Sequence, residues 1–151
     1  MNINELIDER LIDLHVKGKT KEAILKSLCI PLLNVDAISD ADGCYQDIMK
    51  RESEVSTGFI KGIAIPHTQS KHVKRTSISI AKCEEKIFWE TLDDEPVQLI
   101  FLICVPLHES GTHLKILAKI AEMLTEEEIC VELTQANTTE ELLTIIRREI
   151  Q

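Results

Sequence analysis

Residues 99–105, with the sequence LIFLICV, constrain the fold of this chain more than any other segment. All of these residues are apolar, so a strand formed here has no face suited to water. Such a strand lies at the centre of a sheet that helices cover on both sides. Pro106 follows directly and lacks the N–H group that sheet pairing needs, so we expect the strand to end there.

Strand and helix patterns alternate along the rest of the chain, and no linker rich in proline, glycine or serine divides it. Short apolar or alternating runs predict further strands at residues 12–16, 62–66 and 77–80. Helical spacing and capping residues predict helices that open near Thr20, Asp40, residues 110–112, 125–128 and 138–141. In the third of these helices we expect Leu114, Leu117 and Ile120 to face the core. Together these patterns predict one α/β domain over residues 1–151, built as a three-layer sandwich.

Charge and composition limit the partners and the compartment. The chain has 26 acidic and 17 basic residues and a formal charge of −9, which opposes binding to nucleic acid or to anionic lipid. No apolar run reaches the roughly 20 residues that span a bilayer, and residues 1–5 do not resemble a signal peptide, so we expect a cytoplasmic protein without membrane insertion. The five cysteines include no C-x-x-C pair and are expected to be buried small hydrophobic residues.

His67 is the first candidate for chemistry because it follows the short apolar run of residues 62–66. Pro66 should stop strand pairing and leave His67 exposed at a strand edge. An imidazole with a pKa near neutrality can take a proton, a metal ion or a phosphoryl group, and a hydrogen-bonded loop histidine is the other interpretation. His113 lies in the first turn of a predicted helix, where it either helps to hold an anion or merely occupies a first-turn position. Arg51, at a helix end, either satisfies the helix dipole or grips a phosphoryl group.

Motifs for other kinds of catalysis are missing from the sequence. The H-E-x-x-H motif is absent, and the pairs His67/His72 and His108/His113 are five residues apart, which does not stack them on one helical face. Neither G-x-S-x-G nor the glycine-rich loop of nucleoside-triphosphate enzymes occurs. We therefore expect no metal site and no cofactor.

Four blocks in series carry a resemblance to a known family. They are residues 54–58 (EVSTG), 62–67 (GIAIPH), 96–106 (PVQLIFLICVP) and 113–121 (HLKILAKIA). In this order they resemble the fructose/mannitol-type (type 2) IIA component of the bacterial phosphoenolpyruvate-dependent sugar phosphotransferase system, and the likeness runs from about residue 4 to residue 146. The resemblance implies a mixed parallel and antiparallel sheet of about five strands with helices on both faces.

The resemblance also implies a function and a set of site residues. His67 would accept a phosphoryl group from the phosphocarrier protein HPr and pass it to a IIB domain, which works with a membrane IIC component in sugar uptake. His113 would be the second active-site histidine, and Arg51 would stabilise the phosphoryl group. The protein would thus be a phosphohistidine phosphotransferase that uses neither metal nor nucleotide. Two positions depart from the family pattern: Thr68 replaces a small residue, and Pro31 is expected to kink or end the first long helix.

Two expectations remain open after this comparison of motifs. The first is the role, because a regulatory module of the nitrogen-related branch, whose phosphorylation state controls a partner protein, would use the same histidine. The second is the docking face, which we expect around His67 on residues 58–60 and 106–109, apolar with an acidic rim.

Overall fold

Strand β5 (Val97–Pro106) lies at the centre of the sheet, as its apolar sequence predicts. The computed structural model describes residues 3–150. The other strands are β1 (Ile7–Val16), β2 (Ile63–Ala64), β3 (His67–Ser70) and β4 (Ser77–Ile87). The helices are α1 (Ile3–Leu6), α2 (Lys21–Asn34), α3 (Ala41–Glu54), α4 (Ser110–Met123), α5 (Glu127–Gln135) and α6 (Thr139–Glu149).

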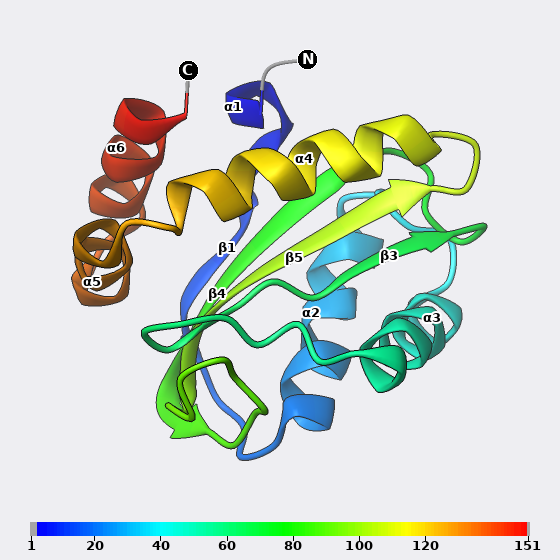
Figure 1. Ribbon diagram of the computed structural model, residues 1–151. Coiled ribbons are helices and arrows are strands. Elements are labelled where there is room, and N and C mark those ends of the chain that lie inside the picture. Colours follow the sequence, from blue (N-terminus) through cyan, green and yellow to red (C-terminus); the bar gives the residue numbers. More distant parts are fainter. Residues whose placement is uncertain (1–2, 151) are drawn as a thin grey trace.

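The five-stranded sheet is mixed, as expected. Its order is β1-β4-β5-β2, and β3 also pairs with β5, just beyond β2 along the same edge. β1 is parallel to β4, β4 is antiparallel to β5, and both β2 and β3 are parallel to β5. The carboxyl ends of β3 and β5 therefore lie at the same end of the sheet, which is where the connection to α4 begins (Figure 1).

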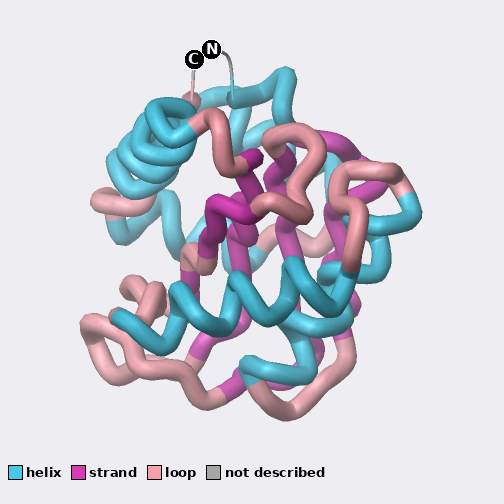
Figure 2. The backbone as a smooth tube through the Cα atoms, turned by 90° about the vertical axis from the view of Figure 1, so that its right-hand side faces the viewer, coloured by secondary structure: helices cyan, strands magenta, loops and turns pink. Residues whose placement is uncertain are grey.

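Helices cover both faces of this sheet and give the expected three-layer α/β sandwich (Figure 1). From β5, Ile100, Leu102 and Cys104 belong to the core cluster that includes residues of α2 and α3. The alternate residues of β5 belong to a second cluster, with residues of α4, α5 and α6; they are Leu99, Phe101, Ile103 and Val105. The strands run between helices in the turned view as well (Figure 2). β5 is thus apolar on both faces because helices cover both sides of it, as predicted.

Three of the predicted helix starts are capped by a side chain as expected, and two are not. Asp40 accepts from the N–H of Gly43 at the start of α3, whereas α4 begins after Glu109 without a side-chain cap. The side chains of Thr20 and Thr138 accept hydrogen bonds from the backbone N–H groups of Ala23 and Glu141, at the starts of α2 and α6. The capping box at residues 125–128 is wrong: the hydroxyl of Thr125 donates instead to the carbonyl of Glu122 at the end of α4. α5 begins one residue later than a cap at Thr125 would require, with Glu126 as its N-cap.

Two further expectations about helices are corrected. Pro31 does not end α2, which continues to Asn34 because the following turn is closed by a hydrogen bond from the N–H of Val35 to the carbonyl of Pro31. In α4, Leu114 is exposed and Ile116 is buried in its place, although Ile120 faces the core as expected. Apolar residues at both 114 and 116 left the buried face of this part of α4 ambiguous.

All five cysteines are free and buried, as predicted for small hydrophobic residues. At the opposite side of the fold from α3, α1 lies beside the end of α6, and Nδ2 of Asn4 donates to the carbonyl of Ile150 across 2.9 Å (Figure 1). Within residues 3–150, no helix has the length and apolar character to cross a membrane.

Candidate active site

His67 is positioned by a break in the edge of the sheet. The strand expected over residues 62–66 is shorter, β2 (Ile63–Ala64), and a second strand, β3, follows it from His67. Between them the N–H of Ile65 donates to Thr57, and Pro66, which has no N–H, hydrogen-bonds to β5 only through its carbonyl, which accepts from Ile103. Pairing resumes with His67, which lies opposite Ile103 of β5. His67 thus begins a strand, but the expectation that it is exposed is wrong, because its side chain is covered and the residue is only 7 % exposed.

The hydrogen bond of His67 determines which ring nitrogen is available. Nδ1 lies 3.0 Å from the carbonyl oxygen of Ile65. A carbonyl oxygen can only accept, so Nδ1 carries the hydrogen and donates it. In the neutral ring, Nε2 then has the free lone pair. The turn at Pro66 therefore fixes both the position and the tautomer of this imidazole.

The surroundings of His67 keep its ring neutral. Burial lowers its pKa below the usual 6.5, and the nearby guanidinium of Arg51 acts in the same direction. The hydrogen bond to Ile65 and the carboxylate of Glu52 oppose this shift without cancelling it. At neutral pH the ring of His67 is therefore uncharged.

His113 lies in the first turn of α4, as predicted, and its ring faces that of His67. The two ring centroids are 4.9 Å apart, with the planes tilted by 45°. Burial lowers the pKa of His113, and so do the nearby His67 and Arg51. Its Nε2 is buried and has no hydrogen-bond partner among the described residues.

Arg51 lies in the last turn of α3, and its Nη1 donates to the carbonyl of Val55 across 3.1 Å. This bond supports the interpretation of Arg51 as a helix cap. The same side chain lines a hollow of about 400 Å³ together with His67 and His113. The structure thus brings together all three site residues that the sequence singled out, from α3, β3 and α4.

The rim of this hollow is not acidic, contrary to expectation. Asp47 and Glu54 lie on it, but so do Lys50 and Lys71. Leu107 from the predicted docking loop 106–109 lines the hollow and is exposed. Residues 58–60 are not among those lining it. Phe59 is partly buried and packs against the core cluster that includes residues of α4 to α6.

Three residues near the site were missed in the sequence. Glu52 is a buried carboxylate directly after Arg51, and it accepts hydrogen bonds from Trp89 and Thr57. Asp47 accepts a hydrogen bond of 2.5 Å from Ser70 and so ties α3 to β3. Gln69 lines the hollow. Spacing offered a signal for two of them, since Asp47 is one helical turn before Arg51 and Gln69 is two strand residues after His67.

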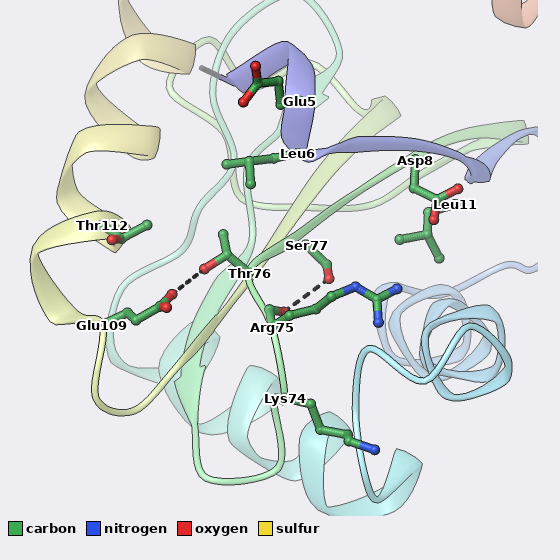
Figure 3. Close-up of a pocket in the computed structure, with 10 residues that line it drawn as sticks. All are labelled: Glu5, Leu6, Asp8, Leu11, Lys74, Arg75, Thr76, Ser77, Glu109 and Thr112. Atoms are coloured by element: carbon green, nitrogen blue, oxygen red, sulfur yellow. Dashed lines mark hydrogen bonds between the residues drawn. The ribbon is translucent and has the colours of Figure 1, made fainter. Parts of the chain in front are cut away.

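A larger hollow, of about 530 Å³, lies elsewhere and is shown in Figure 3. Its lining comes from α1, β1, residues 74–77 and the start of α4, and it includes neither His67 nor His113. There Thr76 donates a hydrogen bond of 2.6 Å to Glu109, which holds the N-cap residue of α4 against the start of β4. This contact supports the helix that carries His113. Within residues 3–150, no group of histidine, cysteine, aspartate or glutamate side chains is arranged to hold a metal ion.

Comparisons with known proteins agree with this geometry. The sequence pattern of "Phosphoenolpyruvate-dependent sugar phosphotransferase system, EIIA 2" matches residues 5–149. The chain is 30 % identical over 148 residues to the fructose-specific EIIABC component of Bacillus subtilis, covering 98 % of this chain and 23 % of that protein. It is 27 % identical over 150 residues to the fructose-specific EIIA component of Haloferax volcanii, covering 99 % of this chain and 97 % of that protein.

The fold is also similar to solved structures. The nitrogen regulatory protein IIA-Ntr from Neisseria meningitidis superposes with a TM-score of 0.87 at 26 % identity, covering 95 % of this chain and 98 % of that one. The chain spans about a quarter of the Bacillus relative, in which the EIIA part is joined to further components. The resemblance in the four sequence blocks is confirmed by a match over nearly the whole chain, and the protein belongs to the EIIA type 2 family of the phosphoenolpyruvate-dependent sugar phosphotransferase system.

Proposed function

We propose that this protein is a IIA subunit that accepts a phosphoryl group from phospho-HPr on Nε2 of His67 and passes it to a IIB domain. The observation that carries the proposal is the hydrogen bond from Nδ1 of His67 to the carbonyl of Ile65. It directs the proton to one nitrogen and leaves the other as a nucleophile, inside a hollow that also holds His113 and Arg51.

In the proposed reaction, the lone pair of Nε2 attacks phosphorus while the bond from phosphorus to the donor's imidazole breaks. The hydrogen on Nδ1 stays in its bond to Ile65, so the acceptor ring neither gains nor loses a proton as the phosphoryl group arrives. His113 and Arg51 donate hydrogen bonds to the phosphoryl oxygens, where negative charge is concentrated. Catalysis then consists of positioning and electrostatic stabilisation, and we propose that neither metal nor nucleotide takes part.

The proposed partners follow from the relatives. Because the fructose-specific protein of B. subtilis is named as an EIIABC component, we propose that this chain works with IIB and IIC components, of which IIC lies in the membrane. We further propose that residues 1–151 form a single domain that works in the cytoplasm without binding nucleic acid. The net charge of −9 supports the last point.

A second candidate function is regulatory. The similarity to the nitrogen regulatory protein of N. meningitidis, at a TM-score of 0.87, favours a module whose phosphorylation state controls a partner protein. The phosphorylated residue would be the same. Growth of a deletion strain on fructose, hexitols and pentitols distinguishes the two roles, because loss of growth on one sugar supports the transport subunit.

The experiment that tests the proposal is phosphorylation of the purified protein by phosphoenolpyruvate, enzyme I and HPr. We expect one acid-labile phosphoryl group per chain and none on His67→Ala. His15→Ala is the matched control, because His15 is exposed on β1 and should leave labelling unchanged. Equal labelling of His67→Ala and the parent protein would refute the assignment.

A further inference from the structure

Two buried nitrogen atoms without a hydrogen-bond partner among residues 3–150 belong to side chains at the same hollow. They are Nε2 of His113 and Nε2 of Gln69. Buried polar groups in folded proteins are nearly always paired, and an unpaired one calls for a physical explanation. An unpaired amide lowers stability, so its retention beside His67 suggests that it gains a partner in another state of the protein.

The strand geometry puts Gln69 on the same face of β3 as His67. Side chains in a strand alternate, so residues 67 and 69 point to one face, and their Cα atoms are about 7 Å apart. Gln69 lies opposite Val105 of β5, which belongs to the cluster that includes residues of α4. The other face of β3 is turned to α3, where Ser70 donates to Asp47. Gln69 is therefore on the side of the sheet from which His113 approaches.

We infer that the side-chain amide of Gln69 donates a hydrogen bond to an oxygen of the phosphoryl group on His67, as a positioning donor beside His113 and Arg51. This rests on the proposed function, since it needs a phosphoryl group at His67. Phosphoryl oxygens accept strong hydrogen bonds from N–H donors, and a neutral amide adds such a bond without adding charge. The phosphoryl group would satisfy the amide that the unmodified protein leaves unpaired.

The inference predicts opposite effects on stability and on transfer. Gln69→Met keeps the size of the side chain and removes the unpaired amide, so its melting temperature should equal or exceed that of the parent protein. Its rate of phosphoryl transfer from HPr should fall about 10- to 100-fold, the range for loss of one hydrogen bond to a charged group. Gln69→Glu should be slower still, because its carboxylate repels the phosphoryl oxygens. Gln69→Lys, which keeps an N–H donor of similar reach, should retain more of the rate than Gln69→Met.

A spectroscopic readout separates this role from a structural one. The side-chain amide of Gln69, assigned by its absence in Gln69→Met, should shift in ¹H–¹⁵N spectra when the full chain is phosphorylated, and its hydrogens should exchange more slowly with water. Gln46, exposed on α3, is the matched control, and Gln46→Met should transfer at the parent rate.

The outcomes distinguish this inference from the function on which it rests. If the parent protein takes up no label on His67, the proposed function fails. If the parent is labelled but Gln69→Met transfers at the parent rate, or the Gln69 amide does not respond to phosphorylation, the inference alone is overturned. A Gln69→Met variant that is slow only because it melts at a lower temperature would also contradict it.

Discussion

The indole Nε1 of Trp89 donates a hydrogen bond of 2.8 Å to Oε1 of Glu52, and both residues are buried. The same carboxylate accepts hydrogen bonds from the backbone N–H and the hydroxyl of Thr57, at 3.1 and 2.6 Å. Lys21 lies 3.4 Å from it and also stands over the Trp89 ring. Glu52 is thus the point at which the end of α3, the turn after it and the strand connection at Trp89 are joined. Arg51 is the neighbouring residue in the last turn of α3.

The Glu52→Gln variant tests how much the hydrogen bonds of the Glu52 carboxylate contribute to stability. A glutamine presents an NH₂ group where the carboxylate accepts from several donors, so at least one buried donor loses its partner. We expect a loss of about 3 kcal/mol in the free energy of unfolding, the magnitude for breaking one side of a buried charged network. Denaturant titration followed by Trp89 fluorescence measures it. Glu84→Gln, on an exposed position of β4, should change stability by less than about 0.5 kcal/mol, and equal effects of the two would contradict the role of Glu52.

His113→Ala separates a helper from a nucleophile. The variant keeps Nε2 of His67 and should still be phosphorylated, but it loses one donor next to the acceptor ring. We expect single-turnover transfer from HPr to slow by ~10²–10³, the usual effect of removing one positioned donor. Complete loss of labelling would contradict a role limited to assisting transfer, and an unchanged rate would leave His113 a residue of the helix start.

Arg51→Lys tests whether charge alone is enough at this position. Lysine keeps the positive charge that lowers the pKa of both histidines, but it loses the planar pair of donors. We expect slower transfer, by less than the ~10²–10³ of complete donor removal. Arg147→Lys, exposed on α6, is the control. A parent-like rate for Arg51→Lys would mean that Arg51 acts through its charge or only as the cap on Val55.

Residue pattern alone predicted much of the fold and part of the site. β5 is apolar on both faces, so helices must cover both sides of it. Thr20 and Thr138 each cap a helix by accepting from the N–H of the residue three positions later, a contact that depends only on local sequence. The predictions for one helix cap and one helix face failed where two local arrangements compete. Thr125 bonds backward to Glu122, and Leu114 and Ile116 offer two orientations for one helix turn.

The details of the site depend on contacts between distant segments, which one sequence does not contain. His67 is buried in a hollow lined by distant segments, the end of α3 and the start of α4, so a strand-edge argument alone made the residue exposed. Neither Gln69 nor Glu52 belongs to a sequence motif. Gln69 stands out because its buried Nε2 has no hydrogen-bond partner among the described residues, and Glu52 because donors from other segments converge on its carboxylate.

The lowered pKa values of His67 and His113 predict the pH dependence of transfer and of stability. Protonation of Nε2 blocks attack, so the transfer rate should hold as pH falls past 6.5 and decline only below the folded pKa of His67. In the unfolded chain both rings take up protons near pH 6.5, before the folded protein does. The free energy of unfolding is therefore complete above 6.5 and falls as pH drops through the folded pKa values. Imidazole NMR titration and single-turnover rates check this, and a rate already halved above pH 6.5 would contradict it.

The docking face for HPr should centre on Leu107 rather than on Phe59. Leu107 is 62 % exposed and lines the His67 hollow, and Leu114, 66 % exposed, follows His113 in α4. Phe59 instead packs on the core, and its N–H donates to Ile63 across 2.8 Å. We therefore expect Leu107→Ala to raise the KM for phospho-HPr with kcat nearly unchanged, and Phe59→Ala to lower the melting temperature with KM nearly unchanged.

Added salt distinguishes the long-range electrostatic attraction of HPr from its apolar contact with Leu107. The rim of the hollow carries both signs of charge, so attraction of a basic partner must come mainly from the net charge of −9. That field is screened as the Debye length falls from ~10 Å at 0.1 M to ~3 Å at 1 M salt. Stopped-flow transfer across this range should show slower association, with a slope that Leu107→Ala leaves unchanged because it removes no charge. A salt-independent association rate, or a parent-like KM for Leu107→Ala, would place the footprint of HPr on another part of the surface.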